Sequence, residues 1–308
     1  MKLIKPDFWN KNNLIVFLLW PLTLITKIVL FIKKYQKPYN SSIPTICVGN
    51  IYLGGTGKTQ LVIKLNQILK KKYKTFVIKK YYSNQVDEQK LLKKSTRLIL
   101  PNSRISGLKK INNSKKNIAI FDDGLQDKSL RYTISIACFN SISGIGNGKL
   151  LPAGPLREDL FELNNYNAVF INGKKNLNLE NKIKKYNDKI KIFNSKYILK
   201  NKNDFNLNSK YLAFCGIGTP ENFFNLLKEN KIRIHKKIVF PDHFDYNSSD
   251  IHNINEVALK NNYEIVTTEK DFMKIANLNH GKINFLKVDM EIKNINGMTN
   301  FLKEKING

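Results

Sequence analysis

The chain has 308 residues, of which 42% are hydrophobic, so it can bury one large or two modest cores and is not a disordered protein. Its net charge of +28 would suit nucleic acid or anionic lipid. The lysines are spread along the chain and form no basic-aromatic array on which single strands could stack, so we expect a membrane and no nucleic-acid partner. Three cysteines lie in apolar runs without metal-ligand spacing and are expected to be buried thiols: Cys47, Cys138 and Cys215.

The first expected element is an apolar helix over Leu14–Ile32, with basic residues on both flanks. It is just short of the about 20 apolar residues that cross a bilayer, contains Lys27 and is interrupted by Pro21. Both tryptophans of the chain, Trp9 and Trp20, fall in this region, as is typical of residues at a lipid headgroup boundary. These features favour an interfacial, membrane-associated helix, with a true span or a buried helix as alternatives.

Beyond this helix, short apolar runs alternate with helical stretches. A first set of strands is expected at Thr45–Val48, Thr75–Ile78, Arg97–Leu100, Ile118–Phe121 and Thr133–Cys138. A second set is expected at Tyr211–Cys215, Arg233–Phe240, Glu264–Thr267 and Asn284–Val288. The intervening stretch Asn165–Asn208 is rich in Asn and Lys, has weak periodicity, and is interpreted as a connecting region.

Such alternation predicts an α/β fold, with a parallel sheet carrying helices on both faces and a smaller C-terminal α/β lobe. The predicted domain boundaries are 1–40 for the N-terminal membrane-associated helix, 41–165 for the core, and 166–308 for the connecting region with the smaller lobe.

A glycine-rich loop is expected after the first strand, where Cys47–Thr59 reads CVGNIYLGGTGKT, and a helix should begin at Lys58. The backbone N–H groups of such a loop and the helix N-terminus form an anion site. The lysine can reach the β- and γ-phosphates, and the threonine hydroxyl can bind Mg²⁺. The strict P-loop pattern would have glycine at Tyr52, and a glycine-rich turn before an ordinary helix is the alternative. The residues expected to bind nucleotide are Tyr52, Leu53, Gly54, Gly55, Thr56, Gly57, Lys58 and Thr59.

Two adjacent carboxylates end a later strand, in the run Asn117–Gly124 with the sequence NIAIFDDG. A carboxylate at this position can hold Mg²⁺ opposite the phosphate loop, and Asp122 is the better candidate, with Asp123 beside it. Acidic residues are also common in ordinary turns. Together with the loop, however, this run predicts a P-loop NTPase-like core that binds ATP and Mg²⁺.

Several further stretches are unusual. They read DDGLQ at Asp122–Gln126, GIGNGKLLPAGPLRE at Gly144–Glu158, GIGTPENFF at Gly216–Phe224, FPDH at Phe240–His243 and TTEKD at Thr267–Asp271. With the phosphate loop, this set closely resembles the tetraacyldisaccharide 4′-kinase family, over nearly the whole chain. GGTGKT, DDGLQ and LPAGPLRE in that order are highly specific.

The resemblance implies a reaction and a location. ATP would phosphorylate the 4′-hydroxyl of a tetraacylated glucosamine disaccharide 1-phosphate, forming lipid IVA in lipid A biosynthesis. The expected partners are this acylated lipid substrate and membrane lipid. The expected place is the cytoplasmic face of the bacterial inner membrane, where the protein would be peripheral or monotopic.

The resemblance also implies roles for single residues. Asp87 stands at the position of the family's catalytic aspartate, and His243 at that of its histidine partner, so together they would act as general base. We expect them to come from different lobes and to meet when the lobes close. The alternatives without a catalytic role are a helix N-cap for Asp87 and a surface histidine for His243. Lys58, Asp123 and Arg157 would also be catalytic, and the metal would be bound by Thr59, Asp122 and Glu158.

The sequence departs from the family pattern at two places. Lys79-Lys80-Tyr81-Tyr82 stands where the family usually has Ser-Arg-Gly-Tyr, and Asp127 replaces the histidine usual after DDGLQ. These changes bear on substrate contacts and leave the nucleotide site intact. Two other functions remain open from the sequence: a membrane-associated P-loop NTPase switch acting on a protein partner, and a non-catalytic lipid-binding protein. The intact Lys58, Thr59 and Asp122 argue against the second.

Overall fold

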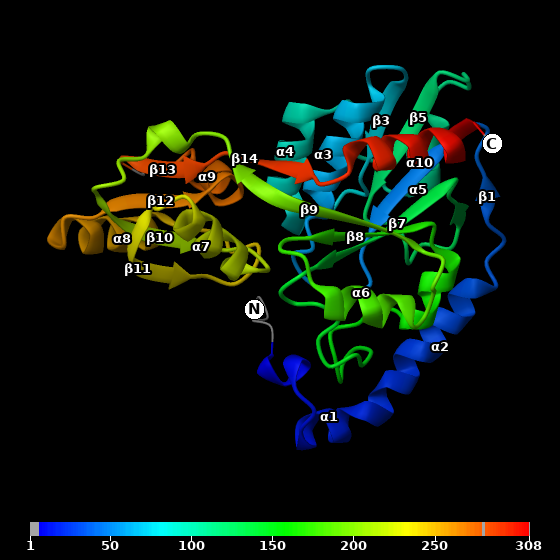
Figure 1. The fold of residues 1–308 in the computed structure, drawn as a ribbon, viewed down its shortest axis with the longest axis horizontal. Coiled ribbons are helices and arrows are strands. Elements are labelled where there is room, and N and C mark those ends of the chain that lie inside the picture. The colour runs from blue at the N-terminus through cyan, green and yellow to red at the C-terminus, as the bar shows by residue number, and fades with distance from the viewer. Residues whose placement is uncertain (1–5, 279–280, 308) are drawn as a thin grey trace. The chain divides into compact units, whose positions relative to one another are not determined.

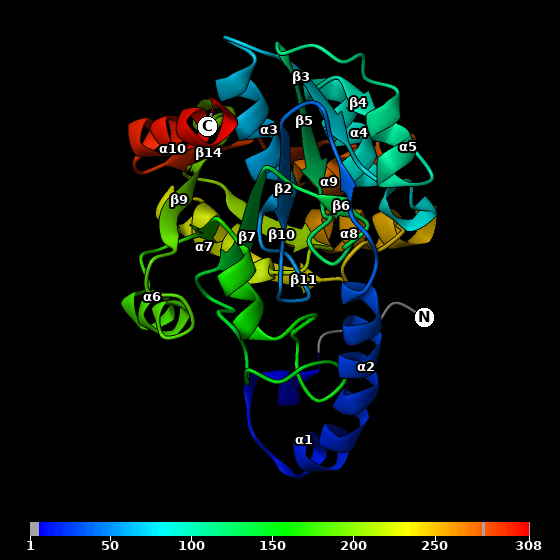
Figure 2. The ribbon, with the colours of Figure 1, turned by 90° about the vertical axis from the view of Figure 1, so that its right-hand side faces the viewer.

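An eight-stranded sheet with the order β14-β9-β8-β7-β2-β5-β3-β4 dominates the computed structural model, which describes residues 6–278 and 281–307. Every described pairing from β9 to β4 is parallel. The central strands β7, β2, β5 and β3 lie side by side in Figure 2. The strands are β2 (Thr45–Gly49), β3 (Lys74–Ile78), β4 (Leu98–Ile99), β5 (Asn117–Asp122), β7 (Ile134–Asn140), β8 (Ala168–Asn172), β9 (Lys191–Leu199) and β14 (Val288–Ile292).

Helices cover both faces of this sheet. α3 and α10 lie on one side and α5 on the other (Figure 2), and α3 packs on β2, β3 and β5. Because both faces are covered, β2, β5, β7 and β8 are buried at every residue, which explains their nearly continuous apolar sequences. The helices of this part of the chain are α3 (Lys58–Leu69), α4 (Val86–Ser95), α5 (Arg104–Lys109), α6 (Leu177–Lys184) and α10 (Ile295–Asn307).

The first set of expected strands is confirmed, but the interpretation of Asn165–Asn208 as a connecting region is wrong. This stretch contains β8, α6 and β9. The apolar run of β8 is short and flanked by asparagines, and β9 is exposed or half-buried at most positions, so neither shows a strong pattern. Three strands of the main sheet, β8, β9 and β14, therefore lie beyond residue 165, where the connection was expected to begin.

A second, four-stranded parallel sheet has the order β11-β10-β12-β13. Its central strand β10 sends Tyr211, Ala213 and Cys215 into the core on one face, with α7, and Leu212 and Phe214 into the core on the other, with α8. The expected strands of this region are confirmed. The elements are β10 (Lys210–Cys215), α7 (Pro220–Glu229), β11 (Arg233–Val239), α8 (Ser248–Lys260), β12 (Glu264–Thr268), α9 (Glu269–Ile275) and β13 (Ile283–Leu286).

The chain divides into two units, which Figure 1 displays together with the element labels. The smaller unit comprises Tyr82–Leu91 and Tyr197–Glu291, and therefore includes the first half of α4. Of the described residues, the larger unit contains 6–81, 92–196 and 292–307. The chain passes between the units after Tyr81 and again within α4, β9 and β14. A separate pair of two-residue strands, β1 (Tyr39–Asn40) and β6 (Leu130–Arg131), also belongs to the larger unit.

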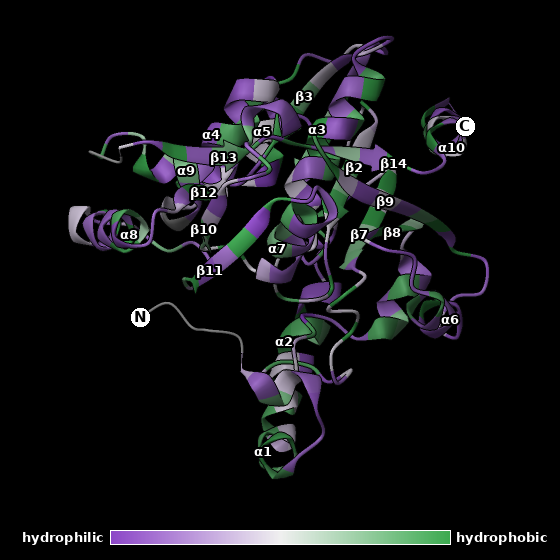
Figure 3. Ribbon diagram, turned by 60° about the vertical axis from the view of Figure 1, so that its left-hand side comes forward, coloured by the Kyte–Doolittle hydropathy of each residue, from purple (hydrophilic) through white to green (hydrophobic). Residues whose placement is uncertain are grey.

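The N-terminal apolar segment is helical over Leu14–Lys34, which is 21 residues and is long and apolar enough to cross a membrane. It consists of α1 (Leu14–Leu19), a 3₁₀ turn at Trp20–Leu22 and α2 (Thr23–Lys34). The 3₁₀ turn contains Pro21, which has no N–H to donate to a preceding helical turn. Hydrophobic residues recur along α1 and α2 in Figure 3, and most of them are exposed. The helix is therefore not a core element of the described fold.

We expect Phe214→Ala to destabilise the smaller unit by about 3–5 kcal/mol, because Phe214 is fully buried between aromatic neighbours and its removal leaves a cavity. Urea unfolding of the detergent-solubilised chain, followed by circular dichroism, measures this. Leu259→Ala on α8 is the matched control, since Leu259 is 82% exposed and should change stability by no more than about 0.5 kcal/mol. Equal effects of the two changes would contradict the assigned core.

Candidate functional site

The glycine-rich loop lies between β2 and α3, at the carboxyl edge of the large sheet. Gly54 and Gly57 have φ values of 138° and 85°, which side chains rarely tolerate, and Gly57 is the N-cap of α3. The loop thus turns sharply and leads into the N-terminus of a 12-residue helix at Lys58. The helix dipole and the free N–H groups of its first turn make this a favourable position for a phosphate.

Side chains from the surrounding elements fix the shape of the loop. The Asn50 amide donates to the carbonyl oxygens of Tyr52 and Gly54, and the Asn140 amide donates to that of Gly55 at 3.3 Å. The buried Thr56 hydroxyl has no hydrogen-bond partner among the described residues. A buried hydroxyl without a partner is costly, so its oxygen is suited to accept or donate a bond to a ligand.

The LPAGPLRE segment packs directly on this loop. The Leu53 N–H donates to the Pro155 carbonyl at 2.8 Å, and the Arg157 N–H donates to the Ile51 carbonyl at 2.7 Å. Tyr52 is buried here and pairs with Leu156 through an isolated bridge. The segment therefore supports the loop from outside the sheet, and Tyr52 and Leu53 contribute to the site through this packing.

The metal-binding candidates meet at the end of β5. The Thr59 hydroxyl lies 3.2 Å from Asp122 Oδ2, and the Lys79 ammonium lies 3.0 Å from the same oxygen. Asp122 and Lys79 are both almost fully buried. A hydroxyl and a carboxylate are the hard oxygen ligands that Mg²⁺ takes beside phosphate groups, so Thr59 and Asp122 fit this ion. Sequence reasoning had given Lys79 no role here.

Asp123 forms a second charged cluster beside the loop. Arg157 Nη1 lies 3.0 and 3.1 Å from the two carboxylate oxygens of Asp123, and donates to Asn50 Oδ1 at 2.7 Å. Burial opposes ionisation of Asp123, but the positive charges of Lys58 and Arg157 outweigh it and hold the pKa of this carboxyl below its ordinary value. The structure thus joins Asp123 and Arg157, and the electrostatic influence of Lys58 extends to the same carboxylate.

Asp127, which stands where the family resemblance predicts histidine, forms an ion pair with Arg104. Arg104 Nη1 lies 2.9 Å from Asp127 Oδ2, and Arg104 Nη2 donates to the backbone carbonyl of Asp123. Asp123 itself has a left-handed backbone, with φ of 62°. The Arg104–Asp127 ion pair therefore supports the turn that carries both candidate carboxylates.

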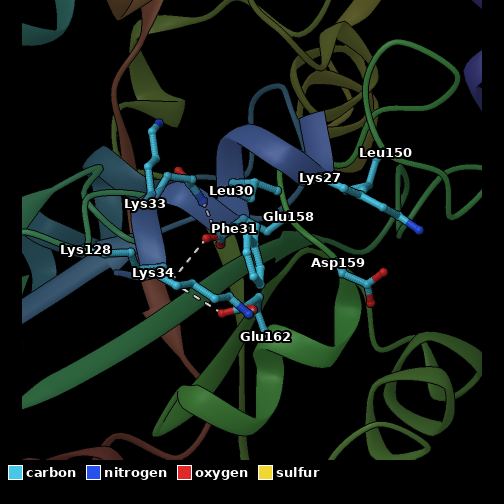
Figure 4. Close-up of a pocket in the computed structure, with 11 residues that line it drawn as sticks. Lys27, Leu30, Phe31, Lys33, Lys34, Lys128, Leu150, Glu158, Asp159 and Glu162 are labelled. Atoms are coloured by element: carbon cyan, nitrogen blue, oxygen red, sulfur yellow. Dashed lines mark hydrogen bonds and ion pairs between the residues drawn. The ribbon is translucent and has the colours of Figure 1, made fainter. Parts of the chain in front are cut away.

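Glu158 lies in a buried polar network. Its carboxylate accepts hydrogen bonds from Tyr166 and from Gln126, and lies 3.3 Å from the Lys128 ammonium. It also lines a pocket near the end of α2, where Figure 4 shows Lys34 directed toward Glu162, at 2.6 Å. No group of three His, Cys, Asp or Glu side chains that could hold a metal occurs in the described part of the chain. The metal role of Glu158 stays a prediction.

The expected dyad is formed in the smaller unit. His243 Nδ1 lies 3.2 Å from Asp87 Oδ1, and the Lys270 ammonium lies 3.3 Å from Asp87 Oδ2. Burial would raise the pKa of Asp87, but the hydrogen bond from His243 and the charges of Lys270 and Lys274 hold it below the ordinary value. Asp87 is therefore ionised at neutral pH and can orient the imidazole.

Hydrogen bonds from neighbouring segments fix the backbone around His243. His243 has a left-handed φ of 57°, and its N–H donates to the Gly216 carbonyl at 3.2 Å. The Gly216 N–H in turn donates to the buried Asp271 carboxylate at 3.0 Å. The motifs GIGTPENFF, FPDH and TTEKD thus converge on one place. Lys270 and Lys274, which face Asp87, lie within or just after TTEKD, and that motif was the available signal for them.

The expectation that Asp87 and His243 come from different lobes is wrong. Both lie in the smaller unit, because the division between the units crosses α4 after Leu91. The pair is already formed in the described structure. Lobe closure is therefore not required to assemble it.

The ionised Asp87 should contribute to stability in a pH-dependent way. Because its pKa is lower in the folded state than its unfolded value of about 3.9, the contribution is present above that value and is lost as pH falls through the folded-state pKa. We expect Asp87→Asn to cost on the order of 2 kcal/mol at pH 7, because it removes the buried negative charge that Lys270 and Lys274 face, and to cost less at pH 3. Urea unfolding at both pH values measures this.

Asp242→Asn is the matched control for that change. Asp242 also lies near Lys270, at 3.7 Å, but is about one-third exposed, so its effect should stay below about 1 kcal/mol. A cost for Asp87→Asn that is the same at pH 7 and pH 3 would contradict the ionised pair.

Comparison with known proteins places this site in a family. The family model of tetraacyldisaccharide-1-P 4′-kinase matches residues 15–307. The tetraacyldisaccharide 4′-kinase of Pelagibacter ubique (strain HTCC1062) is 43% identical over 307 residues, covering 98% of each chain. That of Rickettsia felis (strain ATCC VR-1525 / URRWXCal2) is 34% identical over 325 residues, covering 99% of this chain and 97% of the relative.

A solved structure shares the fold. The crystal structure of LpxK from Aquifex aeolicus in complex with ATP matches with a TM-score of 0.68 and 20% identity, covering 95% of this chain and all of that one. The family match spans nearly the whole described sequence, including the loop, the carboxylates and the dyad. The chain therefore belongs to the tetraacyldisaccharide-1-P 4′-kinase family.

Proposed function

We propose that this kinase transfers the γ-phosphate of ATP to the 4′-hydroxyl of a tetraacylated glucosamine disaccharide 1-phosphate, forming lipid IVA. The observation that carries the proposal is the hydrogen bond from the Thr59 hydroxyl to Asp122, directly after the glycine loop that leads into α3 at Lys58. Membership of the family supplies the acceptor, and the fold of the ATP-bound neighbour is consistent with the donor.

The donor side lies in the larger unit. The glycine loop and the N-terminus of α3 would cradle the phosphates, and Lys58 would offset the charge on the β- and γ-phosphates. Thr59 and Asp122 would hold Mg²⁺, which when bound would supply positive charge that offsets the negative charge of the phosphates. Arg157, fixed by Asp123 and Asn50, provides a further cation beside the loop. These groups stabilise the charge that shifts to the leaving oxygen of ADP.

The acceptor side is the Asp87–His243 pair. Asp87 accepts the Nδ1–H of His243, which fixes the ring and leaves Nε2 to take a proton. The 4′-hydroxyl proton passes to Nε2 as its oxygen bonds to the γ-phosphorus, and the bond from that phosphorus to the β-γ bridging oxygen of ATP breaks. Lys270, whose ammonium lies 3.5 Å from Nε2, adds positive charge close to the reacting oxygen.

A P-loop switch acting on a protein partner is not favoured. Such a switch would need the loop and Asp122, but it offers no role for the buried Asp87 held by His243, Lys270 and Lys274. A non-catalytic lipid-binding protein likewise leaves this cluster and the Thr59–Asp122 junction unexplained.

Turnover assays with purified protein test the reaction. Product formation should require both ATP and the acylated disaccharide phosphate. Lys58→Ala should lower transfer at least about 100-fold through lost phosphate stabilisation, together with nucleotide affinity. His243→Ala should lower transfer about 100-fold with nucleotide affinity retained, since the base acts on the acceptor. ATP hydrolysis that is equally fast without lipid would contradict the kinase proposal, and lost nucleotide binding in His243→Ala would contradict the base assignment.

We also infer that the apolar N-terminal helix associates with the cytoplasmic face of the inner membrane, in a peripheral or monotopic manner. Its side chains are largely exposed, and basic residues flank it, as binding to anionic lipid would need. The helix is tied to the site, because the Thr26 hydroxyl donates to the Leu151 carbonyl and the Trp9 indole donates to the Pro152 carbonyl. An acylated acceptor would be met at the same surface.

Charged substitutions on this helix test the association. We expect Phe17→Glu with Ile25→Glu to move the protein from the pellet to the supernatant when it is spun with phosphatidylethanolamine–phosphatidylglycerol vesicles, because both side chains are exposed and apolar. Leu259→Glu, at an exposed leucine on α8, is the control and should leave the protein in the pellet. Equal pelleting of all variants would place the membrane contact elsewhere.

A further inference from the structure

Lys79 is a buried cation at the centre of the donor site. It follows β3, and its side chain is only 2% exposed. Its ammonium lies 3.0 Å from Asp122 Oδ2, the oxygen that also accepts the Thr59 hydroxyl at 3.2 Å. The positive charge of Lys79 also contributes to the lowered pKa of the neighbouring Asp123. The family resemblance predicts serine at this position, and lysine stands there instead.

Burial of such an ion pair needs a reason. Removing an ammonium and a carboxylate from water costs more than their attraction returns unless the geometry is favourable and further bonds satisfy both groups. A serine at this position would leave the Thr59 hydroxyl on Asp122 Oδ2 but would remove the positive charge of Lys79. Lys79 instead places a permanent positive charge beside Asp122 Oδ2. A divalent ion held by Thr59 and Asp122 would lie close to the Lys79 ammonium, where like charges repel strongly because water is excluded.

We propose that Lys79 is a resident counter-ion of Asp122, which neutralises the carboxylate before Mg·ATP arrives and competes with the divalent cation for it. The inference rests on the proposed function, because that function makes Asp122 a metal ligand. Metal binding displaces the ammonium from Asp122 Oδ2. The flexible four-carbon stem then lets the ammonium turn toward the phosphates that enter with the metal. Free metal should consequently bind weakly, and nucleotide should strengthen its binding by providing Lys79 with a new partner.

Direct metal binding tests this without relying on activity. Mn²⁺, which suits the same oxygen ligands, is titrated into the full-length protein without nucleotide, and free Mn²⁺ is followed by electron paramagnetic resonance. Lys79→Met should bind Mn²⁺ on the order of tenfold more tightly than the wild type, because a competing charge is gone. Lys79→Arg, which keeps the charge, should bind as weakly as the wild type.

Two further variants isolate the effect. Lys80→Met removes one positive charge from the neighbouring residue and should change Mn²⁺ affinity less than about twofold. The double variant Lys79→Met with Asp122→Asn should lose the tighter Mn²⁺ binding expected of Lys79→Met alone. Circular dichroism of each variant establishes that it is folded, and Lys79→Gln, which also removes the charge and should bind Mn²⁺ more tightly than the wild type, keeps the test decisive should Lys79→Met not fold.

The outcomes separate the two proposals. If Mn²⁺ binds wild-type protein in the presence of a non-hydrolysable ATP analogue, but Lys79→Met binds free Mn²⁺ no more tightly than wild type, the counter-ion proposal alone is overturned. If Mn²⁺ fails to bind the wild type even with the analogue, the assignment of Asp122 as a metal ligand is wrong, and the role of Lys79 falls with it.

Discussion

The parallel pairing of β2 with β5 is the constraint on which the donor site depends. Val48, the last residue but one of β2, is in register with Asp122, and the Asp123 N–H donates to the Val48 carbonyl at 2.8 Å. This register brings the loop after β2 and the two carboxylates after β5 to one edge of the sheet. A slip of one residue would turn Asp122 to the opposite face, away from Thr59. β3 pairs on the other side of β5, which is why Lys79 reaches the same carboxylate.

The two halves of the proposed chemistry belong to different units. Donor-binding groups gather in the larger unit around Lys58, Thr59 and Asp122, whereas the base is complete within the smaller unit. The LPAGPLRE segment has a distinct function in the larger unit, because it contacts the glycine loop through Pro155 and Arg157 and the apolar helix through Leu151. One short segment therefore supports both the nucleotide loop and the element that we assign to the membrane.

Local sequence patterns predicted the parts of the fold whose causes are local. The glycine loop, the start of α3 at Lys58 and the strand ending in Asp122 follow from glycine spacing and continuous apolar runs. β8 was missed because its apolar run is short and flanked by asparagines. The place of Asp87 could not be predicted, since the division inside α4 depends on which distant segments pack together. Lys79 gave no signal either: among 52 basic residues, a buried lysine looks like an exposed one until its partner is known.

Two residues of the proposed site, Asp123 and His243, share a left-handed backbone, with φ of 62° and 57°. Most side chains resist this conformation, whereas glycine adopts it freely and asparagine tolerates it. Substitutions by glycine or asparagine at these two positions would therefore relieve backbone strain. The same substitutions would remove the carboxylate of Asp123 or the imidazole of His243. A relative carrying such a replacement would fold at least as well as its ancestor yet transfer phosphate much more slowly, so a stable fold is a poor guide to activity in this family.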